Sequence, residues 1–364
     1  MKKSACLILL VLAGLLFLFP ACVKENGEKV SGTISAGTVN QIENKKPAEK
    51  KEPDTKPLEL HETTASDNKK NDNKISDTGK IHYLITKNYG TKMVLNKQVN
   101  YQKKSSIIDG LMDTGAEVET SYGGSFISDI NGLKSEKGMA GGVRKDWFYF
   151  VNGIFADGGA LDYFPQPGEK IWWDYHPWKT SQGTPAVIGC FPEPFLHGYR
   201  QKVKATVIMT VAQETEKGLD LQKALQAYGV SDVVVKEINA DILKKREGPT
   251  VIIGQWQELE KLQWLREFNE AYQRNGVYLH FTGEGLELMN YRGEGVRLVQ
   301  DNVGVICATG EGNGDDSPLW IITGTDRSGT EAALELLTRH PEKVQASYGV
   351  AVLPGEIIKL PVMR

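Results

Sequence analysis

The stretch that decides the fold spans residues 147–178 and reads WFYFVNGIFADGGALDYFPQPGEKIWWDYHPW. Two runs in it, 147–151 and 170–175, are rich in aromatic residues and are bounded by Gly, Asn, Asp and Pro, which is typical of antiparallel strands and their turns. Because successive side chains of a strand point to opposite faces, each run places aromatic rings on both faces of a sheet. One face can pack against a core, and the other must be covered or exposed for a purpose. Trp172 and Trp173, as neighbours, cannot both face the same core.

The residues before this stretch predict the rest of a small domain. Short runs rich in Ile, Val, Leu and Tyr are bounded by turn residues, and one apolar run has helical spacing. Ser105 or Ser106 can cap this helix, and Gly115 follows its end. The expected elements are strands at 81–86, 93–99 and 126–130 and a helix at 107–114. Several strands with one helix predict a small α+β domain at residues 80–178, in which a sheet holds one helix.

Four segments of this domain occur in an order known from one family. They read SSIIDGLMDTG, FISDINGL, WFYFVNG and GGALDYFPQPGEKIWWDY. In these segments the chain resembles the transcobalamin C-terminal-like domain, which occurs in intrinsic factor, in transcobalamin and in bacterial surface proteins. The resemblance implies a β-grasp-type module that binds a ligand, with a corrinoid or another small flat cofactor as the candidate. The helical repeats of the vitamin carriers are not found in the sequence, so a second surface would have to complete the site.

Exposed Trp and Tyr side chains offer a large contact area together with a polar N–H or O–H group, which suits flat rings, sugars and partner proteins. The alternative for each is packing in a small β core. A solvent-facing contact is expected from Trp172 or Trp173, or from Tyr175 and Trp178 beyond them. The candidate ligand-binding residues are Trp147, Tyr149, Asn152, Tyr163, Trp172, Trp173, Tyr175 and Trp178.

The first residues predict export. Lys2 and Lys3 precede an apolar run at 7–19 that is too short to span a membrane and suits a signal peptide at residues 1–22. The ending Phe-Pro-Ala-Cys resembles a bacterial lipoprotein signal, which implies a lipid on Cys22 that anchors the protein to the outer face of the bacterial cell membrane. Ordinary signal cleavage nearby is the alternative.

Residues 23–79 contain no aromatic residue and are rich in Lys, Glu, Asp, Asn, Ser and Thr. Such a segment cannot bury enough apolar surface to offset the cost of ordering. It is therefore expected to be a disordered, charged tether between the lipid and the folded domains. The net charge of −3 for the whole chain gives no support for nucleic-acid binding.

Residues 179–201 are expected to connect two domains. They mix Pro and Gly with large apolar side chains that a free linker would not keep in water. The connector is therefore expected to hold the domains together and to border a cleft. The four large apolar side chains are Phe191, Phe195, Leu196 and Tyr199.

Residues 202–364 alternate strand-like and helical runs, which predicts an α/β domain with a mainly parallel sheet. The clearest helix is expected at 259–274. In the segment TGTDRSGT, Asp326 or Ser328 is expected to cap a helix. The expected strands are 203–210, 233–238, 249–254, 277–281, 304–309 and 319–323, and the other helices are 219–228, a short one opening near 240, and 330–337. The whole chain is predicted to be a multidomain α+β protein.

The sequence carries no recognisable catalytic or metal-binding motif. The six His residues are scattered, and neither HExxH nor GxSxG occurs. Cys190 and Cys307 can pair in an oxidising compartment or stay as separate buried thiols. The acidic segment 310–316 lacks the ligand spacing of a calcium loop. No catalytic residue, metal ligand or resident cofactor is therefore predicted.

The leading hypothesis is an extracytoplasmic, lipid-anchored binding protein, whose two domains together hold a small ligand for delivery to a membrane transporter. The alternative is a noncatalytic surface module, whose aromatic residues contact another protein or a cell-wall glycan. A pocket between the domains would favour the first, and a flat aromatic patch the second. A hydrolase would require a cleft lined by paired carboxylates, for which Asp157, Asp162 and Asp174 lie nearest to the aromatic residues.

Overall fold

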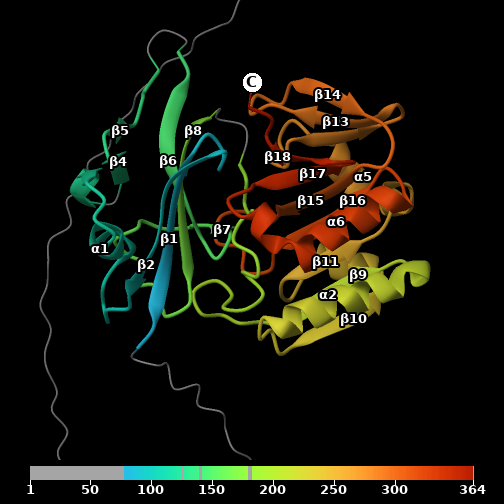
Figure 1. Cartoon of the computed structure of the whole chain (residues 1–364), viewed down its shortest axis with the longest axis horizontal. Coiled ribbons are helices and arrows are strands. Elements are labelled where there is room, and N and C mark those ends of the chain that lie inside the picture. Colours follow the sequence, from blue (N-terminus) through green and yellow to red (C-terminus); the bar gives the residue numbers. More distant parts are fainter. Residues whose placement is uncertain (1–77, 125, 139–141, 179–182, 364) are drawn as a thin grey trace, which may run out of the picture. The chain divides into compact units, whose positions relative to one another are not determined.

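The computed structural model describes residues 78–124, 126–138, 142–178 and 183–363 (Figure 1). The expected signal peptide, Cys22 and nearly all of the expected tether lie outside these residues. Among the helices of the described part of the chain, none is long and apolar enough to cross a membrane. We call residues 78–178 the N-terminal lobe, residues 183–205 the connector and residues 206–363 the C-terminal lobe.

The N-terminal lobe is built on a five-stranded mixed sheet with the strand order β2-β1-β8-β6-β7 (Figure 1). β1 and β8 are parallel neighbours, and the other pairs are antiparallel. The strands are β1 (Lys80–Lys87), β2 (Lys92–Asn100), β6 (Arg144–Val151), β7 (Ile154–Phe155) and β8 (Lys170–Trp178). A small antiparallel sheet adds β3 (Val118–Ser121), β4 (Phe126–Ile130) and β5 (Leu133–Lys134), with a 3₁₀ turn, η1 (Tyr122–Gly124), before β4.

The one helix of this lobe, α1 (Ile107–Asp113), forms for local reasons. The Ser106 hydroxyl accepts a hydrogen bond from the N–H of Asp109, and the Asp109 carboxylate accepts one from the N–H of Ser106, which makes a capping box. Its apolar face is buried, beginning with Ile107. Tyr83 of β1 donates its hydroxyl to the Ile107 carbonyl at 3.0 Å, which ties the helix to the sheet. The predicted helix and its Ser106 cap are confirmed.

The C-terminal lobe is built on a seven-stranded sheet with the order β10-β9-β11-β16-β15-β17-β18. The first four strands are parallel and the other pairs antiparallel, so the expected mainly parallel sheet is in fact mixed. One reason for the antiparallel pairs is the two-residue turn Pro354-Gly355 between β17 and β18. A connection this short can join only antiparallel neighbouring strands. The strands are β9 (Thr206–Thr210), β10 (Val233–Glu237), β11 (Thr250–Ile253), β15 (Gly304–Thr309), β16 (Leu319–Gly324), β17 (Gly349–Leu353) and β18 (Glu356–Leu360).

A separate antiparallel sheet in this lobe consists of β12 (Leu279–Thr282), β13 (Gly285–Met289) and β14 (Gly295–Val299). Asp326 caps the helix α6 (Arg327–Arg339), because its carboxylate accepts a hydrogen bond from the N–H of Gly329 at 2.8 Å. The expected helix at 259–274 is shorter than predicted, because it begins only after Leu262, whose backbone is extended (ψ 118°), and ends at Glu270. The helices are α2 (Thr215–Ala227), α3 (Ala240–Lys244), α4 (Trp256–Leu259), α5 (Gln263–Glu270) and α6 (Arg327–Arg339), with 3₁₀ turns η2 (Ala212–Glu214) and η3 (Pro341–Val344).

The connector packs against both lobes. The ring of Phe195 lies 5.0 Å from that of Trp320 on β16, and Lys170 of β8 donates to two connector carbonyls at 2.8 and 3.0 Å. Of the four large apolar side chains of the connector, Phe191, Phe195 and Tyr199 are buried and Leu196 is partly buried. Cys190 and Cys307 are separate buried thiols, and burial raises the pKa of each to about 12.

The turn between β1 and β2 touches the C-terminal lobe directly. Gly90 in this turn has φ 74°, and a Cβ added to it would lie 1.9 Å from the carbonyl oxygen of Ala346. Lys359 of β18 donates to the carbonyls of Gly90 and Ala346 at 3.2 and 3.1 Å, and burial lowers its pKa. Glycine is therefore required here, because a side chain would separate the two lobes.

Candidate functional site

Both faces of the N-terminal sheet are covered by protein. Trp173 and Tyr175 of β8 belong to the core that contains α1, whereas Trp172 packs in a core shared with the C-terminal lobe. Trp172 is 0% exposed and Trp173 3% exposed. The expectation that one of these two faces solvent is therefore wrong. The surplus of aromatic rings exists because this sheet has a core on each side.

Most of the predicted ligand-binding residues have partners inside the fold. Trp147 donates to the Leu133 carbonyl at 2.8 Å, and Tyr175 donates to that of Lys134 at 2.6 Å. The ring of Tyr149 is stacked 4.6 Å from that of Trp173. These contacts join the main sheet to the small sheet and fill the core, in which Trp147 and Tyr175 are buried and Tyr149 is partly buried.

Asn152 and Tyr163 also hold the structure together. Asn152 adopts φ 52°, and its amide donates to the Gly198 carbonyl at 2.7 Å and accepts from the N–H of Lys170 at 2.9 Å. Tyr163 donates to the Glu169 carboxyl at 2.9 Å. Of the eight predicted residues, Trp178, which is half-buried, borders a cavity between the lobes.

This cavity, which we call the interface cavity, lies between the lobes and has a volume of about 80 Å³. Residues of both lobes and Thr184 of the connector line it. A cleft bordered by the connector was expected from the sequence of residues 179–201, and this cavity lies beside Gly183 and Thr184 of the connector. The aromatic residues that form its walls, with His176, are Tyr89, Phe148, Phe150, Phe155, Trp178, Tyr278 and Tyr348.

His176 is the polar group at the centre of these walls. Its ring lies between those of Tyr89 and Phe148, with centroids 4.0 and 4.3 Å away. Its Nδ1 lies 2.7 Å from the carboxylate of Asp174, which is 0% exposed, and 3.2 Å from the Tyr348 hydroxyl. A carboxylate fixes the tautomer of a neighbouring imidazole. Nδ1–H then donates to Asp174, and Nε2 has no partner among the described residues, so it can accept a hydrogen bond from a ligand.

Two tyrosines of the cavity have an unfavourable backbone conformation. Tyr89 and Tyr278 have φ of 55° and 60°, in the left-handed region that bulky residues avoid, and their rings meet edge to face at 5.5 Å. Such strain concentrates at functional sites. Tyr89, Tyr278 and Tyr348 were not predicted as site residues. For Tyr89, its place between Asn88 and Gly90 in a turn-like segment was a signal of the unusual backbone.

A second buried polar cluster surrounds Glu169, which is 1% exposed. Its carboxyl accepts hydrogen bonds from Tyr163 and from the N–H of Gln166, but burial dominates and raises its pKa to about 7. Nearby, the Glu193 carboxylate raises the pKa of His197. Both groups therefore hold protons in the folded state that the unfolded chain releases at lower pH.

Stability is expected to fall as the pH rises from about 4.5 to 7. In this window the unfolded chain has lost the Glu169 proton while the folded state retains it, so raising the pH favours unfolding. The loss due to Glu169 is about 3 kcal/mol, at about 1.4 kcal/mol per pKa unit. His197 acts in the same direction. Urea unfolding at pH 5 and pH 7.5 measures the change, and Glu169→Gln should remove most of it. An unchanged pH dependence in Glu169→Gln would contradict this assignment.

Residues 105–177 match the model of a family described as "Domain of unknown function (DUF4430)". The match begins just before α1 and ends inside β8, so it covers most of the N-terminal lobe and none of the C-terminal lobe. A comparison with curated proteins finds no match for the chain. The chain contains a DUF4430 domain at residues 105–177.

Proposed function

We propose that this chain is a noncatalytic ligand-binding protein that takes the edge of a small flat molecule into the interface cavity. The observation that carries the proposal is the cavity itself, whose aromatic walls come from both lobes. An apolar cavity with a few polar groups is typical of small-molecule sites. The resemblance of the N-terminal lobe to the transcobalamin C-terminal-like domain supports the same class of function.

The cavity volume limits what can enter. A cavity of about 150 Å³ holds benzene, and the interface cavity has roughly half that volume. A corrinoid is much larger, so only one edge or one substituent of it would enter while the rest lay outside. An inserted ring edge would meet the faces of the wall rings, which is a favourable geometry. Nε2 of His176 and the hydroxyl of Thr184 provide hydrogen-bonding atoms at the wall.

We also propose that the protein acts outside the cytoplasm, where a lipid on Cys22 holds it at the membrane and it hands its ligand to a transporter. The lipoprotein-like ending of the signal supports the anchor. The composition of residues 23–79 supports a tether that places the folded lobes at a distance from the bilayer.

The alternative, a surface module that presents a flat aromatic patch to a protein or glycan, has less support in the stretch 147–178. Every residue of 147–178 is described, and Phe164, at 48%, is the one exposed aromatic residue among them. Of the carboxylates considered for a hydrolase, Asp157 pairs with Arg200 at 2.6 Å and Asp174 belongs to the buried network, whereas Asp162 is exposed.

The test is a fluorescence titration of the protein with benzimidazole as a small flat probe and with cobinamide and cobalamin, corrected for absorbance. Saturable quenching is expected for at least one of them. Trp178→Ala should weaken that binding about fivefold, because it removes one wall ring worth about 1 kcal/mol. Trp178 is half-buried, so its removal leaves the cores intact.

The matched control is Trp256→Ala, which removes a half-buried tryptophan of the C-terminal lobe outside the interface cavity. It should leave this binding unchanged. The absence of saturable quenching with all three molecules, or equal affinity in the unmodified protein and Trp178→Ala, would rule out the interface cavity as the ligand site.

A further inference from the structure

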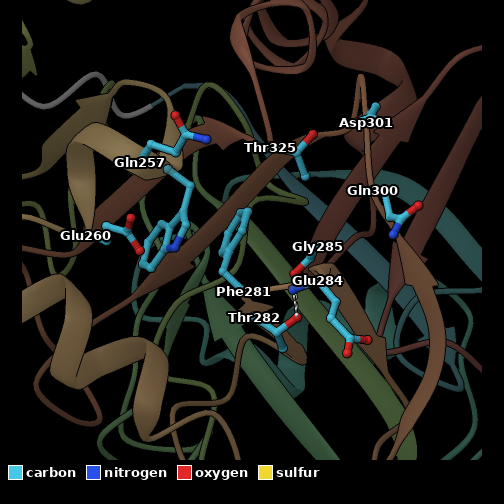
Figure 2. A pocket seen from close by; sticks show the side chains of 11 residues that line it. Gln257, Glu260, Phe281, Thr282, Glu284, Gly285, Gln300, Asp301 and Thr325 are labelled. Atoms are coloured by element: carbon cyan, nitrogen blue, oxygen red, sulfur yellow. Dashed lines mark hydrogen bonds between the residues drawn. The ribbon is translucent and has the colours of Figure 1, made fainter.

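We infer that the C-terminal lobe carries a second site, an acidic groove that binds an uncharged or amine-bearing sugar ring. The groove lies just beyond the ends of β11 and β16 and has a volume of about 590 Å³ (Figure 2). Ligands of α/β sheets commonly bind outside the carboxyl ends of parallel strands. The groove shares no lining residue with the interface cavity, so the inference does not depend on the proposed function.

An aromatic wall forms one part of the groove. Trp256, the first residue of α4, stacks on Phe281 of β12 with ring centroids 4.4 Å apart and an interplanar angle of 8°. Phe281 is buried and covers one face of the indole, whereas Trp256 is half-buried. The C–H groups of a sugar ring are slightly positive and are attracted to the negative face of an aromatic ring. The exposed part of Trp256 can therefore pack against a sugar.

Polar side chains surround this wall. Figure 2 shows Gln257 and Glu260 on one side, Gln300 and Asp301 on the other, and Glu284 at the β12–β13 turn. None of these five side chains has a hydrogen bond or ion pair with another described residue, so their amide and carboxylate groups are available to ligand hydroxyls. Amide and carboxylate groups pair well with hydroxyl groups, because carboxylates accept and amides both donate and accept.

A buried hydroxyl behind the wall is also without a partner. Thr323 of β16 is 1% exposed, and its Oγ1 makes no hydrogen bond with a described residue. Thr323 lines a small void of about 10 Å³ together with Trp256 and Phe281. A volume of this size accommodates about one water molecule or one hydroxyl group. Thr323 therefore adds a polar side chain to the void next to Trp256 and Phe281.

The charge of the groove selects among sugars. Its lining contains the carboxylates of Glu260, Glu284 and Asp301 and no Lys, Arg or His residue. A negatively charged sugar would be repelled, whereas a neutral sugar is tolerated and an ammonium group is attracted. Acidic sugars are therefore excluded, and an amino sugar is preferred over its neutral counterpart.

The test is calorimetric titration of the whole chain at pH 7 with glucosamine, glucose and glucuronate. Saturable binding is expected for glucosamine and, more weakly, for glucose, and none for glucuronate. Trp256→Ala should weaken binding about tenfold, since the stacked ring supplies about that factor. Glu284→Gln, at an exposed position that does not contribute to the core, should reduce the preference for glucosamine over glucose.

Trp178→Ala is the matched control and should bind sugars with unchanged affinity. Failure of both glucosamine and glucose to bind would overturn the inference, as would equal binding of glucuronate or unchanged affinity in Trp256→Ala with a native circular dichroism spectrum. The two proposals can fail separately. Trp178→Ala tests the interface cavity and serves as the control for the groove, whereas Trp256→Ala tests the groove and serves as the control for the cavity.

Discussion

Asp174→Ala is expected to lower the free energy of unfolding by about 3–5 kcal/mol, because it removes a buried acceptor shared by several donors. Asp174 is 0% exposed. Its carboxylate accepts hydrogen bonds from the Thr86 hydroxyl, from the N–H groups of Tyr89 and Gly90 at 2.9 and 3.0 Å, and from Nδ1 of His176 at 2.7 Å. Alanine leaves these donors buried without an acceptor. Urea unfolding at pH 7, followed by tryptophan fluorescence, measures the loss.

The control is Asp220→Ala on α2. The Asp220 side chain is 61% exposed and pairs with Lys223 at 3.4 Å, so its removal should change stability by less than about 0.5 kcal/mol. If Asp174→Ala also cost less than about 1 kcal/mol, the buried network would not exist in solution as described. The β1–β2 turn would then not be held against β8 by this carboxylate.

Trp172→Ala is expected to destabilise the protein by about 3–5 kcal/mol, as large truncations in a core do. The Trp172 ring is 0% exposed and lies 5.5 Å from Phe150 and 5.3 Å from Tyr348, so alanine would open a cavity between the lobes. Its indole N–H donates to the Thr86 hydroxyl at 2.7 Å. Urea unfolding measures this effect as well.

Trp264→Ala is the control for Trp172→Ala, because Trp264 lies half-buried on α5 outside the sheets and should cost much less. The double variant of Trp172 and Asp174 gives a further check. Thr86 bonds to both residues, so their effects should deviate from additivity by about 1 kcal/mol. Strict additivity, or a loss below about 1 kcal/mol for Trp172→Ala, would contradict the packing of the two lobes.

Trp172 is consequently a poor probe of ligand binding. A loss of binding in Trp172→Ala would report a damaged core rather than a lost contact. Trp178, at the end of the same strand, is half-buried and borders the interface cavity, so it separates binding from folding. This choice depends on burial, which the aromatic pattern of the strand did not reveal.

Elements with local causes could be predicted from the sequence. Ser106 and Asp109 close a capping box within four residues, Asp326 caps α6, and short runs of apolar residues mark central strands such as β11 and β15. Each of these signals lies in neighbouring residues, whose spacing determines hydrogen bonds and faces directly. The aromatic runs 147–151 and 170–175 were likewise correctly placed on strands, β6 and β8.

The candidate sites depended on contacts between distant residues. His176 meets Tyr89 and Tyr348, and Trp256 stacks on Phe281, across gaps that no local pattern spans. The sequence by itself determined many of the elements, among them α1 and α6, and the two-sided aromatic character of β8. Only the tertiary structure decided that both faces of β8 are covered, that the C-terminal sheet is mixed, and that a cavity and a groove remain. The physical reason is that burial and the closing of a cavity depend on how the elements pack, and packing depends on long-range contacts rather than on neighbours in the chain.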